Sequence, residues 1–391
     1  MRSRGFTLME AMLASALGLV VLAASLTVGV QLQRKAIFEQ QASLIQGGTQ
    51  AVTEFFAPML QRAGQGMGNA RINLGASTFG YAVQVTTRDP FRGFSNFSLP
   101  PDAYADRASD SLQIRWADPA SLVPLTACNL SGADGGTGVF SRDVLGSCTL
   151  TQATAYDAGT AVFFVNPDLP EACSHVTTAS ASPGTPGVHA PYLPTQPFPT
   201  ATDAPAGDGC GPNGALWATP GTVLMSAGGI TFRVNWVTGS PVLEWTQRAP
   251  PLPSDTWTEL SRDVEQMTVS LGIRDLTPDS GVPLTWYPNS DGGTWAPDQC
   301  AGFTAVGPCS IPGGVGPPAL DPTTWDALMR RTRAVEIRLL ARAARRDGPG
   351  MAGPDGGGFA LDMDGNPEDG YARRSLVMTL APRNFQIAGS F

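Results

Sequence analysis

The chain contains very little lysine and histidine: one lysine, Lys35, and two histidines in 391 residues. A phosphate loop of the Walker type or a Schiff-base site needs a lysine at a defined place, so both kinds of site are nearly excluded. The net charge is −8 and no large basic cluster occurs in the sequence, which argues against nucleic-acid binding. The 45 Gly and 34 Pro indicate frequent turns and exclude a long all-helical fold.

Motifs for catalysis and metal binding are also missing. The sequence has no C-x-x-C pair and no G-x-S-x-G elbow. Its two histidines, His175 and His189, lie in a Gly/Pro-rich stretch that we expect to be loop. Residues 362–369 could hold calcium, but Pro367 stands where an EF-hand loop needs Gly, so a solvated turn is favoured. We therefore predict a protein that is not an enzyme and has no catalytic residue, cofactor or metal site.

One long apolar run opens the chain. Apart from Glu10, residues 6–33 carry no charge, and Arg2 and Arg4 precede them. A helix needs about 20 apolar residues to cross a bilayer, so this run is long enough, and no later run is. The two arginines place the N-terminus in the cytoplasm and the body of the chain outside. A cleaved secretory signal is the less favoured alternative, because Glu10 would then lie inside its apolar region.

The N-terminus resembles the class III leader of type IV prepilins. A short basic leader ends at Gly5, Phe6 follows, and Glu10 stands four residues after Phe6 at the start of the apolar run. The resemblance implies that a prepilin peptidase cleaves between Gly5 and Phe6 and methylates the new amino terminus. It also implies that the Glu10 carboxylate of a neighbouring subunit neutralises the Phe6 amine inside an apolar filament core.

The apolar run should continue as one long helix. Helical spacing of apolar residues persists through residues 34–57, and Pro58 is the first proline, so we expect a helix over residues 6–57, about 78 Å long. Beyond Pro58 the period changes to 2, which predicts strands. A hairpin is expected over residues 230–247, around Thr238-Gly239-Ser240. The predicted strands are 81–86, 111–116, 160–165, 222–225, 230–237, 242–247, 264–273, 332–340 and 375–380.

Together these patterns predict an α+β, pilin-like fold: a long N-terminal helix packed on an antiparallel β-sheet head with disulfide-braced loop insertions. The expected divisions are a leader (1–5), a transmembrane and filament-core segment (6–33), an amphipathic shaft (34–57) and an extracytoplasmic head (58–391). The head includes a Gly/Pro-rich insertion over residues 119–218. Its longest Gly/Pro-rich tract, residues 167–220, is expected to be ordered loop rather than strand.

Six cysteines lie in the part of the chain that we place outside the membrane. An even number of widely spaced cysteines in an exported protein favours disulfides over metal or catalytic thiols. Fifteen pairings are possible, and pairing of neighbours along the chain is the simplest because each bond closes one Gly/Pro-rich loop. The candidates are Cys128 with Cys148, Cys173 with Cys210, and Cys300 with Cys309.

Further stretches are similar to PilW-type minor pilins. They are a turn after the shaft (residues 60–64), a central strand (263–275) and a closing hairpin (333–342 with 373–384). Major pilins usually carry a proline in the middle of the apolar segment, and its absence around Thr27 points toward a minor subunit.

The resemblance implies a subunit of a tip complex that initiates pilus assembly and presents a large tip adhesin. Expected partners are other minor pilins and the major pilin through the N-terminal helix, the prepilin peptidase, and that adhesin. The protein would first sit in the inner membrane as a single-pass protein with a periplasmic body, and later at the pilus tip. Alternatives are a minor pseudopilin of type II secretion, similar to the J subunit, or a ligand-binding, adhesive subunit displayed on a pilus.

Overall fold

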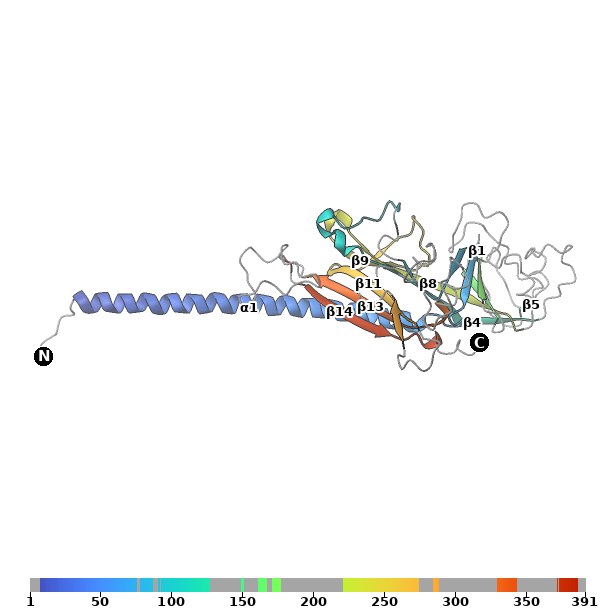
Figure 1. Cartoon of the computed structure of the whole chain (residues 1–391), viewed down its shortest axis with the longest axis horizontal. Coiled ribbons are helices and arrows are strands. Elements are labelled where there is room, and N and C mark those ends of the chain that lie inside the picture. Colours follow the sequence, from blue (N-terminus) through green and yellow to red (C-terminus); the bar gives the residue numbers. More distant parts are fainter. Residues whose placement is uncertain are drawn as a thin grey trace.

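A long helix with a β-rich head at its C-terminal end makes up the computed structural model, which describes residues 8–75, 78–86, 91, 93–126, 149–150, 161–166, 171–176, 221–273, 284–287, 329–342, 371 and 373–385. The helix, α1, spans Leu8–Arg62, and its N-terminal part projects away from the head (Figure 1). The other elements are β1 Arg71–Gly75, β2 Thr78–Gly80, β3 Val83–Thr86, η1 Asp102–Arg107, β4 Ser111–Thr126, β5 Thr149–Leu150, β6 Ala161–Val165, β7 Glu171–Val176, β8 Val223–Asn235, η3 Val237–Gly239, β9 Val242–Thr246, β10 Thr258–Ser261, β11 Val264–Ile273, β12 Thr285–Tyr287, β13 Thr332–Arg342 and β14 Arg373–Leu380.

The helix passes through Pro58, so the prediction that it ends before this residue is wrong. Proline in a helix interior costs about 3 kcal/mol, because it removes one hydrogen bond and crowds the preceding turn. Burial of the next turn offsets this free-energy cost. Leu60 is fully buried against the head, and its burial stabilises the fold by on the order of 1.5–3 kcal/mol. Pro58 itself lies on the exposed side of α1.

The described strands form two sheets, whereas a single antiparallel sheet was predicted. One contains ten strands along the path β10-β9-β8-β6-β7-β1-β2, with β4 pairing with β8 and carrying β3 and β5. The other has the order β12-β11-β13-β14. Nearly all pairs are antiparallel, but β1 and β7 run parallel, with Ile72 opposite Ala172. The parallel pair arises because the antiparallel β6 and β7 are inserted between β8 and β1.

Most of the predicted strands are present. The hairpin over residues 230–247 is confirmed by β8 and β9, which are antiparallel around Gly239, whose φ is +77°. The predicted strands 222–225 and 230–237 are one continuous strand, β8, because Gly228 lets the chain pass close to the Trp116 indole, 2.4 Å from where a Cβ would lie. The predicted central strand 264–273 is β11, and β13 and β14 form the predicted closing pair.

The segment predicted as an insertion supplies strands to the middle of the large sheet. β6 pairs with β8 on one side and β7 on the other, and β7 then pairs with β1. The expectation of loop throughout residues 167–220 is therefore wrong for β7. The sequence does not indicate this strand, because Gly and Pro flank it and its own six residues include only a few strong strand formers.

Both sheets and the C-terminal part of α1 share one apolar core. Val52, Phe56, Leu60 and Ala63 recur every three or four residues, so they lie on one face of the helix, and all four are buried. The Phe56 ring stacks on Phe232 of β8 at a centroid distance of 4.2 Å. Apolar residues on one helix face thus fix the head to the shaft.

Candidate assembly site

The N-terminal part of α1 is the most apolar surface in the described chain. Within Leu8–Gln33 the mean hydropathy reaches 2.2 over 18 residues, and that stretch is not buried against the rest of the chain. At 1.5 Å per residue these 26 residues span about 39 Å, enough to cross a bilayer by length and composition. Such a surface needs lipid or other helices around it, because this chain does not cover it.

Hydroxyl groups within this apolar segment are satisfied by the helix itself. The side chains of Ser15, Ser25 and Thr27 each donate a hydrogen bond to the carbonyl four residues earlier, at 2.7–2.8 Å. A hydroxyl bonded in this way brings no unpaired polar group into an apolar environment. The segment is therefore suited to an apolar environment despite its polar residues.

Glu10 lies in the first turn of α1, where its side chain is exposed. A carboxylate is favourable at this end of a helix, because the peptide dipoles leave partial positive charge there. Gly5 and Phe6, the predicted cleavage and methylation residues, lie outside the described residues. Cleavage and the pairing of Glu10 with the Phe6 amine stay predictions.

The shaft ends in a tight glycine turn, as predicted for residues 60–64. Gly64 has a φ of +68°, and its N–H donates to the Arg115 carbonyl of β4 at 2.9 Å. A Cβ on Gly64 would lie 2.3 Å from the Gly68 carbonyl oxygen, so only glycine fits. The Asn384 amide donates to the Ala63 carbonyl at 3.1 Å. The C-terminal end of the helix is thus hydrogen-bonded to the large sheet and to the segment that follows β14.

The other end of the junction lies at Gly48. A Cβ there would be 3.1 Å from Asp263 Oδ2, so glycine allows this carboxylate to approach the helix closely. Partial burial raises the pKa of Asp263, and the positive charge of Arg342 opposes that shift. Further toward its N-terminus the shaft has exposed contacts within the helix, such as the Lys35–Glu39 ion pair at 3.8 Å.

A buried ion pair joins β11 to β14 near the same end of the head. Glu265 is fully buried and accepts hydrogen bonds from Arg373 Nε at 2.6 Å and from a terminal nitrogen of Arg373 at 3.1 Å. Arg342 lies 3.9 Å from the same carboxylate. Two guanidinium groups around one carboxylate compensate for its burial, so this cluster stabilises the sheet rather than offering a binding site.

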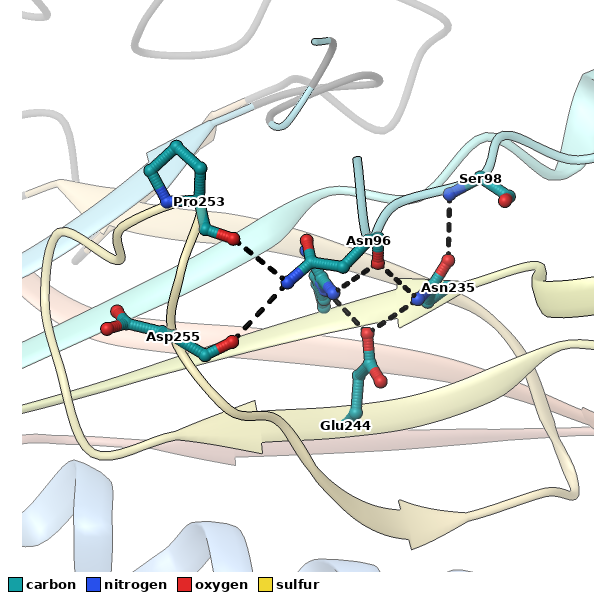
Figure 2. Close-up of polar contacts among 7 residues, drawn as sticks. Asn96, Ser98, Asn235, Glu244, Pro253 and Asp255 are labelled. Atoms are coloured by element: carbon teal, nitrogen blue, oxygen red, sulfur yellow. Dashed lines mark hydrogen bonds and ion pairs between the residues drawn. The ribbon is translucent and has the colours of Figure 1, made fainter. Parts of the chain in front are cut away.

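A second polar network fastens the loop before η1 to the large sheet (Figure 2). Arg233 Nε donates to Glu244 at 2.6 Å, and its terminal nitrogen donates to the Asn96 carbonyl at 2.8 Å. Asn235 donates to the same Asn96 carbonyl at 3.0 Å and accepts from the Ser98 N–H at 2.8 Å. Burial lowers the pKa of Arg233, whereas Glu244 raises it.

Aromatic rings surround the Arg233 guanidinium in the manner of a cation-binding cage. Its central carbon lies 3.6 Å from the ring centroid of Trp257 and 5.3 Å from those of Phe91 and Phe97. Cages of this kind bind external cations when they are empty. Here the protein's own arginine fills it, so its role is structural.

Arg115 is the other fully buried arginine at the centre of the large sheet. It donates to the Ala249 carbonyl at 3.0 Å and the Tyr81 carbonyl at 2.8 Å, both neutral acceptors. Burial lowers the pKa of Arg115 to about 9. Arg115, Arg233 and Glu265 were not predicted as buried residues, because their only signal in the sequence is a charge at an inward-facing strand position.

Of the other residues singled out in the sequence, the structure describes Cys173 and His175. Cys173 is fully buried in β7 and disulfide-bonded. The other five cysteines, one of which is its partner, lie outside the described residues. The pairing stays a prediction. His175 is in β7, not in the predicted loop, while His189 and residues 362–369 also lie outside the described part. Among the described residues, no group of three or more His, Cys, Asp or Glu could hold a metal ion.

Comparisons with known proteins find similarity among solved structures. No protein-family model matches the chain, and no curated protein matches it. Among solved structures, it is similar to the type IV-like pilin TTHA1219 from Thermus thermophilus, with 17% sequence identity and a TM-score of 0.18. The match covers 41% of this chain and 69% of that one. At this identity and score, the similarity does not establish a family.

Proposed function

We propose that this chain is a PilW-like minor pilin, a membrane-anchored subunit that takes part in starting a type IV pilus and presenting a tip adhesin. The observation that carries the proposal is the division of α1: an apolar segment, Leu8–Gln33, that the chain leaves uncovered, and a C-terminal part whose apolar face is buried in the head. One rigid helix with these two properties can hold a head outside a membrane. The same segment can later pack among other helices.

The leader motif supplies the second argument for this role. Cleavage after Gly5 would remove both leader arginines and create a positive amine on Phe6. The Glu10 carboxylate of a neighbouring subunit would then compensate this charge in an apolar surrounding, where an unpaired charge is costly. The role is structural, with partners bound through α1 and no reaction catalysed.

Processing and incorporation test the proposal. Gly5→Arg should leave a full-length precursor in the membrane, because a side chain at this position obstructs the peptidase. Glu10→Ala should still be cleaved but should be several-fold depleted in sheared pili, because the Phe6 amine lacks its partner. Mass spectrometry of the mature N-terminus and quantitation of sheared pili measure the two effects.

Glu39→Ala is the matched control, because it removes another exposed helix glutamate and should leave incorporation unchanged. A mature chain that begins near Ser25 would overturn the proposal in favour of a secretory signal. Deleting the gene should lower the number of surface pili without changing the cellular amount of major pilin. Normal piliation with a loss of protein secretion would instead identify a type II pseudopilin.

A further inference from the structure

The edge of the four-stranded sheet is unusual among the described strands. β14 has a strand neighbour, β13, on one side only. Its residues 375–380 form an uncharged run without Pro or Gly. The edge strands β12 and β2 have three residues each, and Glu259 of β10 forms an ion pair at 2.7 Å with Arg262, which follows that strand. Residues 375–380 of β14 therefore form the longest uncharged edge segment among the described strands.

An edge of this kind selects its ligand by hydrogen bonding. Every second residue of β14 directs its backbone N–H and C=O away from β13, and these groups have the spacing of a strand. Proteins usually shield long edges with charges, prolines or bulges, and an unshielded edge accepts a further strand. The backbone of β14 thus fits an extended polypeptide better than a helix or a small molecule.

The side chains of β14 indicate the chemistry of that strand. Val377, opposite Arg338, is 48% exposed, and Ser375 and Thr379 lie on the same outer side. On the inner side, Leu376 and Leu380 pack on the core but remain partly exposed. An added strand with apolar residues at alternate positions would complete the cover over these two leucines.

Charge at the two ends of the edge restricts the ligand further. Arg374 is exposed at the start of β14, where its guanidinium donates a hydrogen bond to the Gln46 side chain of α1 at 3.5 Å. Arg383 is exposed just after the strand ends. We propose that the free edge of β14 docks an extended segment of another protein, which adds to the sheet as a strand and carries carboxylates at both ends.

A second copy of this chain does not fit the edge. Antiparallel pairing of β14 with β14 of another copy would reverse the direction of α1, so the two copies could not be anchored in one membrane. Parallel pairing would place the outer row of Ser375 and Thr379 beside the inner row of leucines, which leaves the leucines uncovered. This exclusion rests on the membrane anchoring proposed above, whereas docking of another strand does not, so the two can fail separately.

Amide hydrogen exchange on the full-length protein in nanodiscs tests the proposal. The probe is the synthetic peptide Asp-Val-Thr-Val-Thr-Val-Thr-Asp, and the control peptide has Lys in place of both Asp. At about ten times its Kd, the acidic peptide should slow exchange of the outward amides of residues 375–380 roughly tenfold. The lysine peptide should have a much weaker effect, because Arg374 and Arg383 repel it.

Variants in β14 distinguish strand docking from nonspecific binding of the peptide. Val377→Lys puts a charge on the edge and should abolish protection by the acidic peptide, whereas Val377→Thr preserves strand propensity and should retain it. Three results would overturn the proposal: outward amides that are equally protected without peptide, equal protection by both peptides, or a disulfide-linked dimer of Val377→Cys in place of peptide binding.

Discussion

At the scale of single residues, Asp263 couples protonation to the junction between helix and head. Its carboxylate is partly buried beside Gly48, and burial raises its pKa above the ordinary 3.8 although Arg342 opposes the shift. A raised pKa means that the folded state binds the proton more tightly than the unfolded state. The corresponding stabilisation is complete below the unfolded pKa and is lost as the pH rises through the folded pKa.

Asp263→Asn should therefore raise the melting temperature at pH 7, because the amide resembles the protonated acid at every pH. The difference from wild type should shrink below pH 3.8, where the acid is protonated in both states. Thermal unfolding of the detergent-solubilised protein at the two pH values measures this. Asp102→Asn, on the exposed turn η1, is the control. Lower stability of Asp263→Asn at pH 7 would show that attraction to Arg342 outweighs burial.

At the scale of elements, replacing a glycine by alanine should have opposite effects on stability at one position in α1 and one in the turn that ends it. Gly64→Ala should destabilise the head by at least about 2 kcal/mol, because the residue has a left-handed conformation and a Cβ would collide with the Gly68 carbonyl. Gly47→Ala should stabilise by about 0.5–1 kcal/mol, because the helix has open space there. Denaturant unfolding followed by tryptophan fluorescence measures both. Equal effects would contradict the role of Gly64 as an obligatory turn residue.

Local patterns predicted individual elements better than their partners. The apolar run and the period-2 segments predicted most of α1 and eight of the fourteen described strands, because the residues of these elements themselves favour helix or strand. The strands β1, β2, β5, β7, β10 and β12 were not predicted. The sequence did not predict the division into two sheets or the parallel β1–β7 pair, since partner choice depends on the whole core. Arg233 and Asn96 are 137 residues apart, so nothing local indicated their contact. The leader residues of the candidate site were predicted from a motif alone.

At the scale of the whole molecule, the described strands within residues 119–218 are part of the large sheet of the head. β6 lies between β8 and β7, and β7 lies between β6 and β1, so the large sheet depends on both strands. Phe163 and Phe164 of β6 are fully buried. Any partner contact made by this segment is therefore presented by the framework of the sheet.

Deleting residues 119–218 should abolish folding of the head, because β1 loses its partner β7 and the core loses two buried phenylalanines, at about 3–5 kcal/mol each. A smaller deletion provides the control. Thr126 of β4 pairs directly with Thr149 of β5, so residues 127–148 can be replaced by Asn-Gly, which closes a two-residue hairpin. Resistance of the head to limited proteolysis should be lost in the first variant and kept in the second.

The smaller deletion also tests the pairing of the cysteines, since it removes Cys128 and Cys148 together. If these two are bonded to each other, alkylation of the denatured, unreduced variant should find no free thiol. Two free thiols would show that each had a different partner elsewhere in the head. A large deletion variant that keeps a protease-resistant head would contradict the central position of β6 and β7 and restore the interpretation of this segment as a removable insertion.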